Sequence, residues 1–373
     1  MRINKIIFTP FQLPFAGAFK TGAGVLSARQ GVILQLVTDE GLVGLGEAAP
    51  LPEFGGGTLS DVLKELKAIL PTLNDLEVKS LFDLVDSLLL KGGPGVAALC
   101  CSLDTAACDL LAQAESLKLA EWLLPGTKLD STVEVNATVG APETEAAVEA
   151  SQRAIRQGFS CVKLKVGVMP GTKEEIARIK AVRRAIGPEA RLRLDANGAW
   201  GTSQATAILQ ALEDAGIELV EQPVSAHAEA GMLQVQKATS IVIAADEMVT
   251  GLEAARRIIT HGIARVLVIK PVVVGGLRPA RRIIELAEQN GLKSIVTTSI
   301  DSGVGIAASL HLAATLPQPR LACGLATAPL LESSLVRNLP AVIDGKMVLP
   351  DRTGLGIELD EAELKAYTIP EAQ

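Results

Sequence analysis

The sequence predicts an α/β fold: a (β/α)8 barrel of the TIM type preceded by an N-terminal α+β capping domain. Three observations favour it. Strand patterns followed by helical ones fill the N-terminal part, the middle part alternates between short apolar strands and amphipathic helices, and 373 residues suit about two domains. We expect the capping domain over 1–125, the barrel over 126–328, and a C-terminal segment, 329–373, that returns to the capping domain.

The N-terminal part is expected to start as a small antiparallel sheet. Strand-rich runs cover Lys5–Leu13, Gln30–Thr38 and Leu42–Glu47, with a hairpin turn between the last two. Phe15–Leu26, with three glycines and three alanines, is predicted to be a loop, as is Ala48–Gly57. Helical periodicity follows over Leu59–Leu70, Leu76–Leu90 and Gly95–Gln113.

Eight strand candidates, separated by helical segments, then predict the barrel. They are Val133–Thr138, Cys161–Val166, Ala190–Asp195, Glu218–Glu221, Ile241–Asp246, Arg265–Lys270, Lys293–Thr298 and Leu321–Gly324. One helix is expected to begin at Pro142 and another at Thr172, where Thr172 and Glu175 match a capping box. Eight such units favour a closed barrel, because a doubly wound sheet usually has fewer; an open sheet with a helical tail is the alternative.

Composition excludes several classes of function. The net charge is −7 and the basic residues are scattered, which does not match a nucleic-acid-binding surface. No signal-peptide pattern opens the chain, and no uninterrupted apolar run reaches the roughly 18 residues of a membrane span. The odd set of cysteines lacks C-x-x-C spacing and is expected in the core of a cytoplasmic protein: Cys100, Cys101, Cys108, Cys161 and Cys323.

Charged residues recur where the predicted barrel strands end, which is where barrel enzymes carry their chemistry. A single strand-end carboxylate is more often a helix cap or a solvated group, and a single buried lysine is usually paired structurally. Successive strands that all end this way are harder to explain, because clustered carboxylates repel and an inward lysine loses hydration. The residues are Lys163, Lys165, Asp195, Asn197, Glu221, Asp246, Glu247 and Lys270.

The three carboxylates Asp195, Glu221 and Asp246 come from adjacent predicted strands and should converge on one side of the barrel mouth. An all-oxygen ligand set favours a hard cation, most simply Mg2+, with Mn2+ as the alternative. Zinc is disfavoured, because the three histidines fall in predicted helices or on the surface and not at strand ends: His227, His261 and His311.

The lysines suggest the chemistry. Strands two and six of eight lie on opposite sides of a closed barrel, so Lys165 and Lys270 should face each other across the mouth. A substrate carboxylate bound to the cation would hold its α-carbon between two amines, which suits α-proton abstraction with the metal stabilising the enediolate. Positive surroundings would lower the pKa of a lysine, and Lys163 would help to lower that of Lys165.

Together these motifs resemble the enolase superfamily, specifically its muconate-lactonizing-enzyme subgroup, over nearly the whole chain. The matching residues are Lys163-x-Lys165, Asp195-x-Asn197, Glu221-Gln222-Pro223, Asp246-Glu247 and Lys270-Pro271. The resemblance implies metal ligation by Asp195, Glu221 and Asp246, central roles for Lys165 and Lys270, and support from Glu247. It also implies that the Phe15–Leu26 and Ala48–Gly57 loops close over the substrate.

Within the subgroup, Thr298–Gly305 and Gly324–Thr327 look most like o-succinylbenzoate synthases. That likeness implies Mg2+-dependent dehydration of 2-succinyl-6-hydroxy-2,4-cyclohexadiene-1-carboxylate, a step in menaquinone or phylloquinone biosynthesis. Lys165 would remove the α-proton and protonate the departing hydroxyl, while Lys270 stays protonated. Dipeptide epimerases usually carry Asp-x-Asp after strand eight, and Gly324–Thr327 has no acid. The alternatives are an N-succinylamino acid racemase or a dipeptide epimerase of the same subgroup; a non-catalytic relative or a metal-free Schiff-base lysine enzyme is disfavoured.

The same likeness implies a small carboxylate substrate and a set of residues that contact it. Gly303–Gly305 precedes a helix, so its N–H groups suit an anion, although a simple strand-to-helix turn explains the run equally well. Arg29 could also reach the mouth. Neither a nucleic-acid nor a membrane partner is expected, and a homo-oligomer is not excluded. The candidate substrate contacts are Lys163, Asn197, Ser299, Ser302, Gly303 and Gly324.

Overall fold

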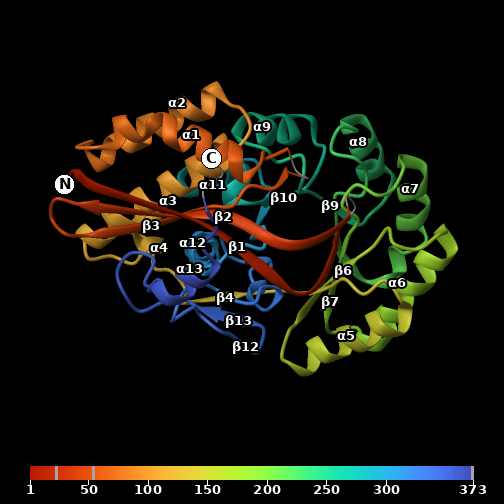
Figure 1. The fold of residues 1–373 in the computed structure, drawn as a ribbon. Helices are drawn as coiled ribbons and strands as arrows, with labels where there is room; N and C mark the ends of the chain where they lie inside the picture. Colours follow the sequence, from red (N-terminus) through yellow and green to blue (C-terminus); the bar gives the residue numbers. More distant parts are fainter. Residues whose placement is uncertain (22–23, 53–54, 371–373) are drawn as a thin grey trace.

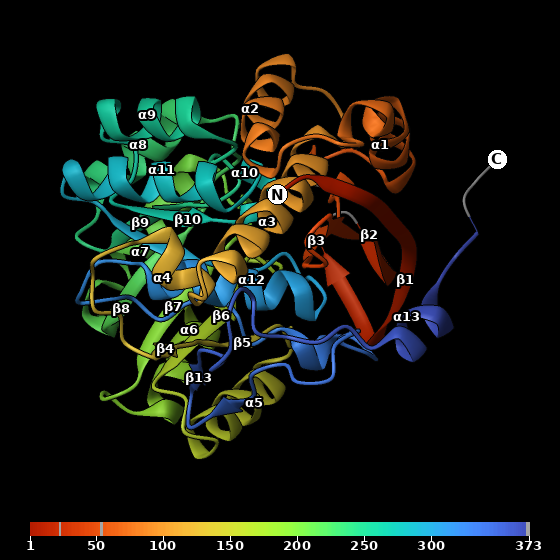
Figure 2. The ribbon, with the colours of Figure 1, turned by 90° about the vertical axis from the view of Figure 1, so that its left-hand side faces the viewer.

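The computed structural model describes residues 1–21, 24–52 and 55–370 (Figure 1). An antiparallel three-stranded sheet with its helices forms the N-terminal part, which we call the cap. A parallel seven-stranded sheet with outer helices forms the larger part. The view in Figure 2 shows the cap strands and α1, α2 and α3 at one side of the parallel sheet.

The cap sheet has the order β1-β2-β3, formed by β1 (Ile3–Thr21), β2 (Gly24–Thr38) and β3 (Val43–Ala48). The loop predicted over Phe15–Leu26 is wrong for most of its length, because β1 and β2 continue as one long hairpin with Phe19 paired to Leu26. Cross-strand backbone pairing outweighs the low strand preference of the glycines and alanines there. Residues 22–23, within this predicted loop, lie outside the described residues.

The helices of the cap follow the predicted order and surround one buried helix. α3 packs so closely on β3 that a Cβ at Gly46 would lie 2.0 Å from the Ser102 carbonyl oxygen, so glycine is required there. By length and composition alone α3 could cross a membrane, but 89% of its most apolar stretch is buried, which is typical of a core helix. The helices are α1 (Leu59–Leu73), η2 (Val78–Ser80), α2 (Leu81–Lys91), α3 (Val96–Ala114) and α4 (Leu119–Leu123).

The parallel sheet runs in the order β11-β10-β9-β8-β7-β6-β5. A segment further along the chain bonds to both of its edges: Cys323 forms a parallel bridge with Val135, next to β5, and Gly324 forms one with Thr297, next to β11. The strands are β5 (Ala137–Val139), β6 (Cys161–Lys165), β7 (Arg191–Asp195), β8 (Ile217–Glu221), β9 (Val242–Ala245), β10 (Val266–Ile269) and β11 (Lys293–Val296).

Helices follow the strands and lie outside the sheet (Figure 1). Their apolar faces pack on outward-facing strand residues in the main core cluster, whereas Leu219, Ala244, Val266, Val268 and Ile295 form a separate inner cluster. The helices are α5 (Thr144–Arg156), α6 (Thr172–Ile186), α7 (Thr202–Gln210), η3 (Glu213–Ala215), α8 (Glu229–Ala238), α9 (Leu252–His261), α10 (Pro271–Val274), α11 (Leu277–Gln289) and α12 (Gly303–Ala314).

Two local predictions need correction. The strand predicted over Val133–Thr138 is two short strands, because β4 (Thr132–Glu134) leaves the parallel sheet to pair with β13 (Lys346–Val348). The capping box at Thr172 is absent: Gly171 is the N-cap, and Glu175 instead accepts hydrogen bonds from three backbone N–H groups of 167–169. Glu175 is therefore used to order the loop after β6.

The C-terminal segment forms bridges with β1 of the cap. Thr368 forms an antiparallel bridge with Phe11, and Leu331 forms one with Phe15, both on β1. Its elements are η4 (Ala328–Leu330), β12 (Val342–Ile343), β13 (Lys346–Val348) and α13 (Glu361–Tyr367). The C-terminal segment thus connects the end of the parallel-sheet part back to β1 of the cap.

One buried histidine helps to join these parts. His311 on α12 accepts a hydrogen bond at Nδ1 from the Ala120 N–H, so its Nε2 donates to the Leu355 carbonyl oxygen, 3.1 Å away. Burial lowers the pKa of this imidazole to about 4. The folded protein therefore holds His311 neutral, and protonation favours the unfolded chain.

We predict that His311 contributes an acid-sensitive part of the stability. Its folded pKa lies below the unfolded value of 6.5, so stability is full above about 6.5 and falls as pH drops toward 4. The loss from this group should reach about 3 kcal/mol. In urea unfolding from pH 7 to 4.5, the stability difference between wild type and His311→Gln should shrink. A difference that stays constant over this range would contradict the assignment.

Candidate active site

The centre of the candidate site is a buried lysine held between two carboxylates. Lys163 Nζ lies 2.8 Å from Asp195 Oδ2 and 2.7 Å from Glu221 Oε1. The three side chains meet because β6, β7 and β8 are adjacent, with Asp195 opposite Glu221 in register, and because alternation turns Lys163 inward. All three are buried or nearly so, with Lys163 only 13% exposed, so each charge depends on the others.

Lys165 lies one pleat further toward the strand ends. Its Nζ donates to Asp195 Oδ2 and to Asn197 Oδ1, both at 2.7 Å. The Asn197 amide in turn donates to Glu247 Oε1 at 2.9 Å. Asn197 has φ +43°, a conformation that asparagine tolerates better than most residues. The structure thus gives Asn197 and Glu247 an observed role in orienting Lys165, which is 30% exposed and more accessible than Lys163.

Lys270 and Asp246 form a second pair from β10 and β9. Lys270 Nζ lies 2.5 Å and 2.6 Å from the two oxygens of Asp246. Gln222 supports this pair by accepting a hydrogen bond from the Asp246 N–H at 3.1 Å. The structure therefore brings the five predicted central residues to the carboxyl ends of β6–β10, with each carboxylate in contact with a lysine.

The electrostatics of the cluster depend on burial. Burial and the negative charge of Asp195 raise the pKa of Glu221 to about 7. Burial also raises the pKa of Asp195, but Lys163 and Lys165 outweigh it and hold that pKa well below its usual value. Burial would lower the pKa values of Lys163 and Lys270, yet the carboxylates raise both overall. In this arrangement the carboxylates therefore set the direction of the pKa shifts of Lys163 and Lys270.

A divalent cation fits the donor chemistry of this site. Asp195, Glu221 and Asp246 supply only oxygen atoms, and the shifts described above show that their charges interact. Yet within 1–21, 24–52 and 55–370 no three acidic, His or Cys side chains are already gathered around one metal position. The lysine amines lie against the carboxylate oxygens instead, so a cation would have to displace them.

Two predicted substrate contacts are already engaged within the protein. Ser302 donates through N and Oγ to the carboxylate of Glu47, at 2.8 and 2.7 Å, and Gly305 N donates to it at 2.8 Å. Gly303 N donates to the Ser334 carbonyl at 2.7 Å. The N-terminus of α12 therefore binds a carboxylate, and this carboxylate belongs to Glu47 of the cap. The expectation that Ser302 and Gly303 offer these donors to a substrate does not fit the structure.

The other two candidates lie close to the end of β11. Gly324 approaches β11 so closely that a Cβ would lie 2.3 Å from Thr297 Oγ1, which explains glycine at this position by packing. Ser299 is 6% exposed, and its Oγ has no hydrogen-bond partner among the described residues. Ser299 is thus the predicted contact whose hydroxyl the surrounding protein leaves unused.

Sequence reasoning missed Glu47 and Asp301 and valued Arg29 too little. Glu47 lies near the end of β3 and Asp301 in a loop, and neither belongs to a recognised motif. Asp301 is 4% exposed and lies 3.9 Å from Arg29 at the boundary between cap and parallel sheet. The sequence did offer one signal: Glu47 lies near the end of an otherwise apolar strand, and a buried carboxylate there needs hydrogen-bond donors or a positive charge.

Comparison with known families agrees with this geometry. Residues 4–124 match the mandelate racemase / muconate lactonizing enzyme N-terminal domain, and residues 145–363 match the enolase C-terminal domain-like family. The chain belongs to the enolase superfamily, in its muconate-lactonizing-enzyme subgroup. The resemblance inferred from the strand-end motifs is confirmed.

Individual relatives have different reactions. The chain is 30% identical to the hydrophobic dipeptide epimerase of Enterococcus faecalis, over 96% of this chain and 99% of that one. A solved structure of the Enterococcus faecalis enzyme, complexed with Mg and the dipeptide L-Leu-L-Tyr, has a TM-score of 0.88 at 28% identity and covers 96% of this chain and 100% of that one. The o-succinylbenzoate synthase of Thermobifida fusca is 37% identical over 65% of this chain and 72% of that one. The N-succinyl Arg/Lys racemase of Bacillus cereus has a TM-score of 0.91 at 25% identity, with 99% of each chain covered.

We predict unequal costs when the two lysines of β6 are removed. Lys163→Met should lower the free energy of unfolding by about 3–5 kcal/mol, because it leaves buried carboxylates without their cation. Lys165→Met should cost roughly 1 kcal/mol, since that side chain is partly solvated. Urea denaturation at pH 8 in EDTA measures both. Equal losses would show that Lys163 does not balance the cluster.

Proposed function

We propose that the chain is a Mg2+-dependent enzyme that removes a proton from the carbon next to a substrate carboxylate. The observation that carries the proposal is the group of three buried carboxylates interleaved with three lysines at the carboxyl ends of β6–β10. In the same proposal the parallel sheet is a (β/α)8 barrel, with Leu321–Gly324 as the eighth strand. Active sites of such barrels lie at this end.

Asp195, Glu221 and Asp246 would hold Mg2+, or Mn2+ in its place. The cation supplies positive charge beside the substrate carboxylate, which makes the neighbouring C–H bond more acidic. Such a cation adds two positive charges to a cluster whose lysines remain in the site, and the substrate carboxylate that it binds offsets part of this charge. The displaced amines then lie where a substrate bound to the cation would meet them.

Lys165 is the proposed base. Among the three lysines it is the most exposed, and Asn197, anchored by Glu247, fixes the position of its amine. Lys165 takes the α-proton and returns it to the departing hydroxyl, so that the C–O bond breaks and water leaves. Lys270 stays protonated and stabilises the negative charge that develops on the substrate.

The reaction we propose is the dehydration of 2-succinyl-6-hydroxy-2,4-cyclohexadiene-1-carboxylate to o-succinylbenzoate, in the cytoplasm. Residues 321–331 contain no acidic side chain, and Asp301 nearby is buried against Arg29. A dipeptide's ammonium group would therefore lack a carboxylate partner there. The unused hydroxyl of Ser299 can instead donate to the succinyl group. The similarity to the Thermobifida fusca synthase supports this choice.

A racemase acting on N-succinylamino acids is the second candidate. It is favoured by the two lysines on separate strands, Lys165 on β6 and Lys270 after β10, since racemisation needs a proton donor and a proton acceptor on opposite faces of the α-carbon. The similarity to the Bacillus cereus racemase supports it too. Because the chain is similar to the Enterococcus faecalis epimerase over its whole length, dipeptides are included as substrates in the assay.

The experiment is a direct assay of purified protein with Mg2+ and with EDTA. The substrates are the cyclohexadiene carboxylate, a panel of N-succinylamino acids and a panel of dipeptides. We expect efficient dehydration that EDTA abolishes. If an amino acid α-proton exchanges with D2O and no dehydration occurs, the enzyme is instead a racemase or an epimerase. Turnover that EDTA does not reduce would refute the requirement for a metal ion.

We predict that Lys165→Ala and Lys270→Ala each abolish turnover, by at least about a thousandfold, because each removes a group that acts on the reacting carbon. Both variants should keep the circular dichroism spectrum of the wild type. Variant Lys237→Ala, on the outer helix α8, is the matched control and should be fully active. Substantial activity in either site variant would refute the two-lysine mechanism.

A further inference from the structure

We propose that Arg29 is a positioning residue that holds the first residues of the 48–57 segment of the cap in register with the end of β11. Through this contact Arg29 sets how tightly the distal group of the substrate is bound. The inference deepens the proposed function and rests on it for the identity of that substrate. Arg29 itself is buried and does not act on the reacting atoms.

The guanidinium of Arg29 connects two separate parts of the chain. It donates to the carbonyl oxygens of Ala49 and Pro50, at the start of the 48–57 segment. Its Nε donates to the Ser299 carbonyl oxygen at 3.2 Å, just beyond β11. The planar guanidinium fixes these acceptors at set angles, so the cap segment and Ser299 keep one relative position.

Glu47 provides a second connection at the same boundary. It lies two residues before Ala49 and accepts hydrogen bonds from Ser302 and Gly305 of α12. A Cβ at Gly305 would lie 3.0 Å from Glu47 Oε2 and 2.5 Å from the Asp301 Cβ, so glycine permits this approach. Glu47 docks β3 on α12, while Arg29 orients the chain that leaves β3.

The buried charges explain why an arginine is needed here. Burial and the charge of Glu47 raise the pKa of Asp301 to about 7, and Arg29 acts in the opposite direction. Removal of Arg29 would leave two carboxylates in a buried space with less positive charge. A variant that removes Arg29 alone therefore mixes a loss of stability with any loss of positioning, and the test must separate them.

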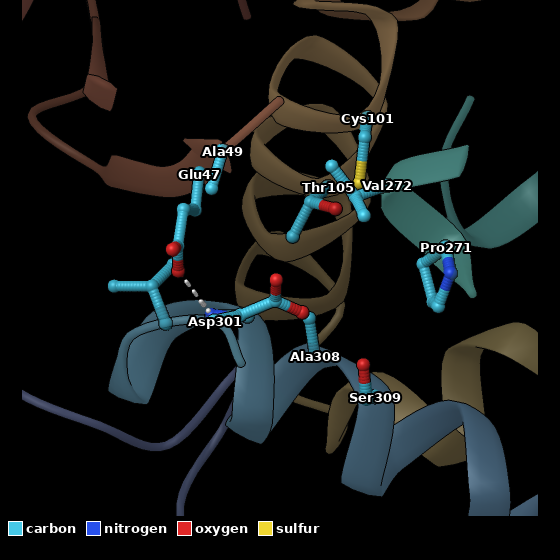
Figure 3. Close-up of a pocket in the computed structure, with 11 residues that line it drawn as sticks. Glu47, Ala49, Cys101, Thr105, Pro271, Val272, Asp301, Ala308 and Ser309 are labelled. Atoms are coloured by element: carbon cyan, nitrogen blue, oxygen red, sulfur yellow. Dashed lines mark hydrogen bonds between the residues drawn. The ribbon is translucent and has the colours of Figure 1, made fainter. Parts of the chain in front are cut away.

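This boundary lies next to the proposed catalytic lysine. Glu47 and Asp301 line a small pocket between α3 and α12 together with Pro271, the residue after Lys270 (Figure 3). The pocket is also lined by Ala49, whose carbonyl Arg29 binds. A shift of the cap segment would therefore move a residue that lines the same pocket as Pro271, the neighbour of Lys270.

The test uses Arg29→Met and the double variant Arg29→Met/Asp301→Asn. The double variant restores the charge balance but not the hydrogen bonds to Ala49, Pro50 and Ser299. Arg278→Met/Asp104→Asn is the matched control, because Arg278 also joins the parallel-sheet part to the cap through a buried aspartate, at 2.7 Å, with its other partners in α2.

We measure thermal stability, kinetic constants and amide hydrogen exchange. In Arg29→Met/Asp301→Asn, Tm should return close to that of the wild type, while KM stays raised by about tenfold and kcat changes less than about threefold, the pattern of lost substrate binding. The amides of Ala48, Ala49 and Leu51 should exchange faster in this variant than in the wild type. The Arg278 control should leave KM and these amides unchanged.

The inference is overturned if KM and amide exchange return to wild-type values together with Tm, or if the Arg278 control raises KM equally. The exchange measurement needs no substrate. Hence a wild type that fails to dehydrate the precursor would refute the proposed function, whereas normal exchange of the Ala48, Ala49 and Leu51 amides in the double variant would refute the role of Arg29.

Discussion

The balance of buried charge at the carboxyl ends of β6–β10 is the interaction on which the rest of the site depends. Carboxylates from three consecutive strands would repel one another strongly in a space this dry, and lysines there would lose their hydration. Lys163 lies between Asp195 and Glu221, and Lys270 lies on Asp246. Each positive charge therefore offsets the free-energy cost of burying the carboxylates, and each carboxylate offsets the cost of burying a lysine. In the proposed function the same arrangement serves a cation, because adjacent parallel strands hold the three carboxylate side chains close together.

The cap completes this site through a second set of buried charges. Glu47 satisfies the N-terminus of α12, which would otherwise attract an anion from solvent or substrate. Arg29 then connects the chain beyond β3 to the end of β11. Close approach of the two parts is helped by Gly305, where a Cβ would lie 3.0 Å from Glu47 Oε2. Cap and parallel sheet are therefore joined by specific polar contacts as well as by apolar packing.

The sequence predicts the strands and the central residues well because both follow short-range rules. Period-2 alternation puts Lys163 and Lys165 on one face, and strand ends place Asp195, Glu221 and Asp246 beside one another. It fails where long-range pairing decides. The hairpin of β1 and β2 extends through Phe15–Leu26 because each strand satisfies the other, and the α12 donors bind Glu47, some 255 residues earlier in the chain. The strand at Val133 divides for the same reason, since β4 pairs with β13.

The most direct measurement is calorimetric titration of the metal-free protein with Mg2+, compared with Asp195→Asn, Glu221→Gln and Asp246→Asn. If the buried carboxylates form the cation site, the wild type binds one equivalent and each variant loses at least about tenfold in affinity, as expected when one charged oxygen ligand becomes neutral. Binding of equal strength in all four proteins would contradict the account, since the lysines would then balance carboxylates that never meet a metal.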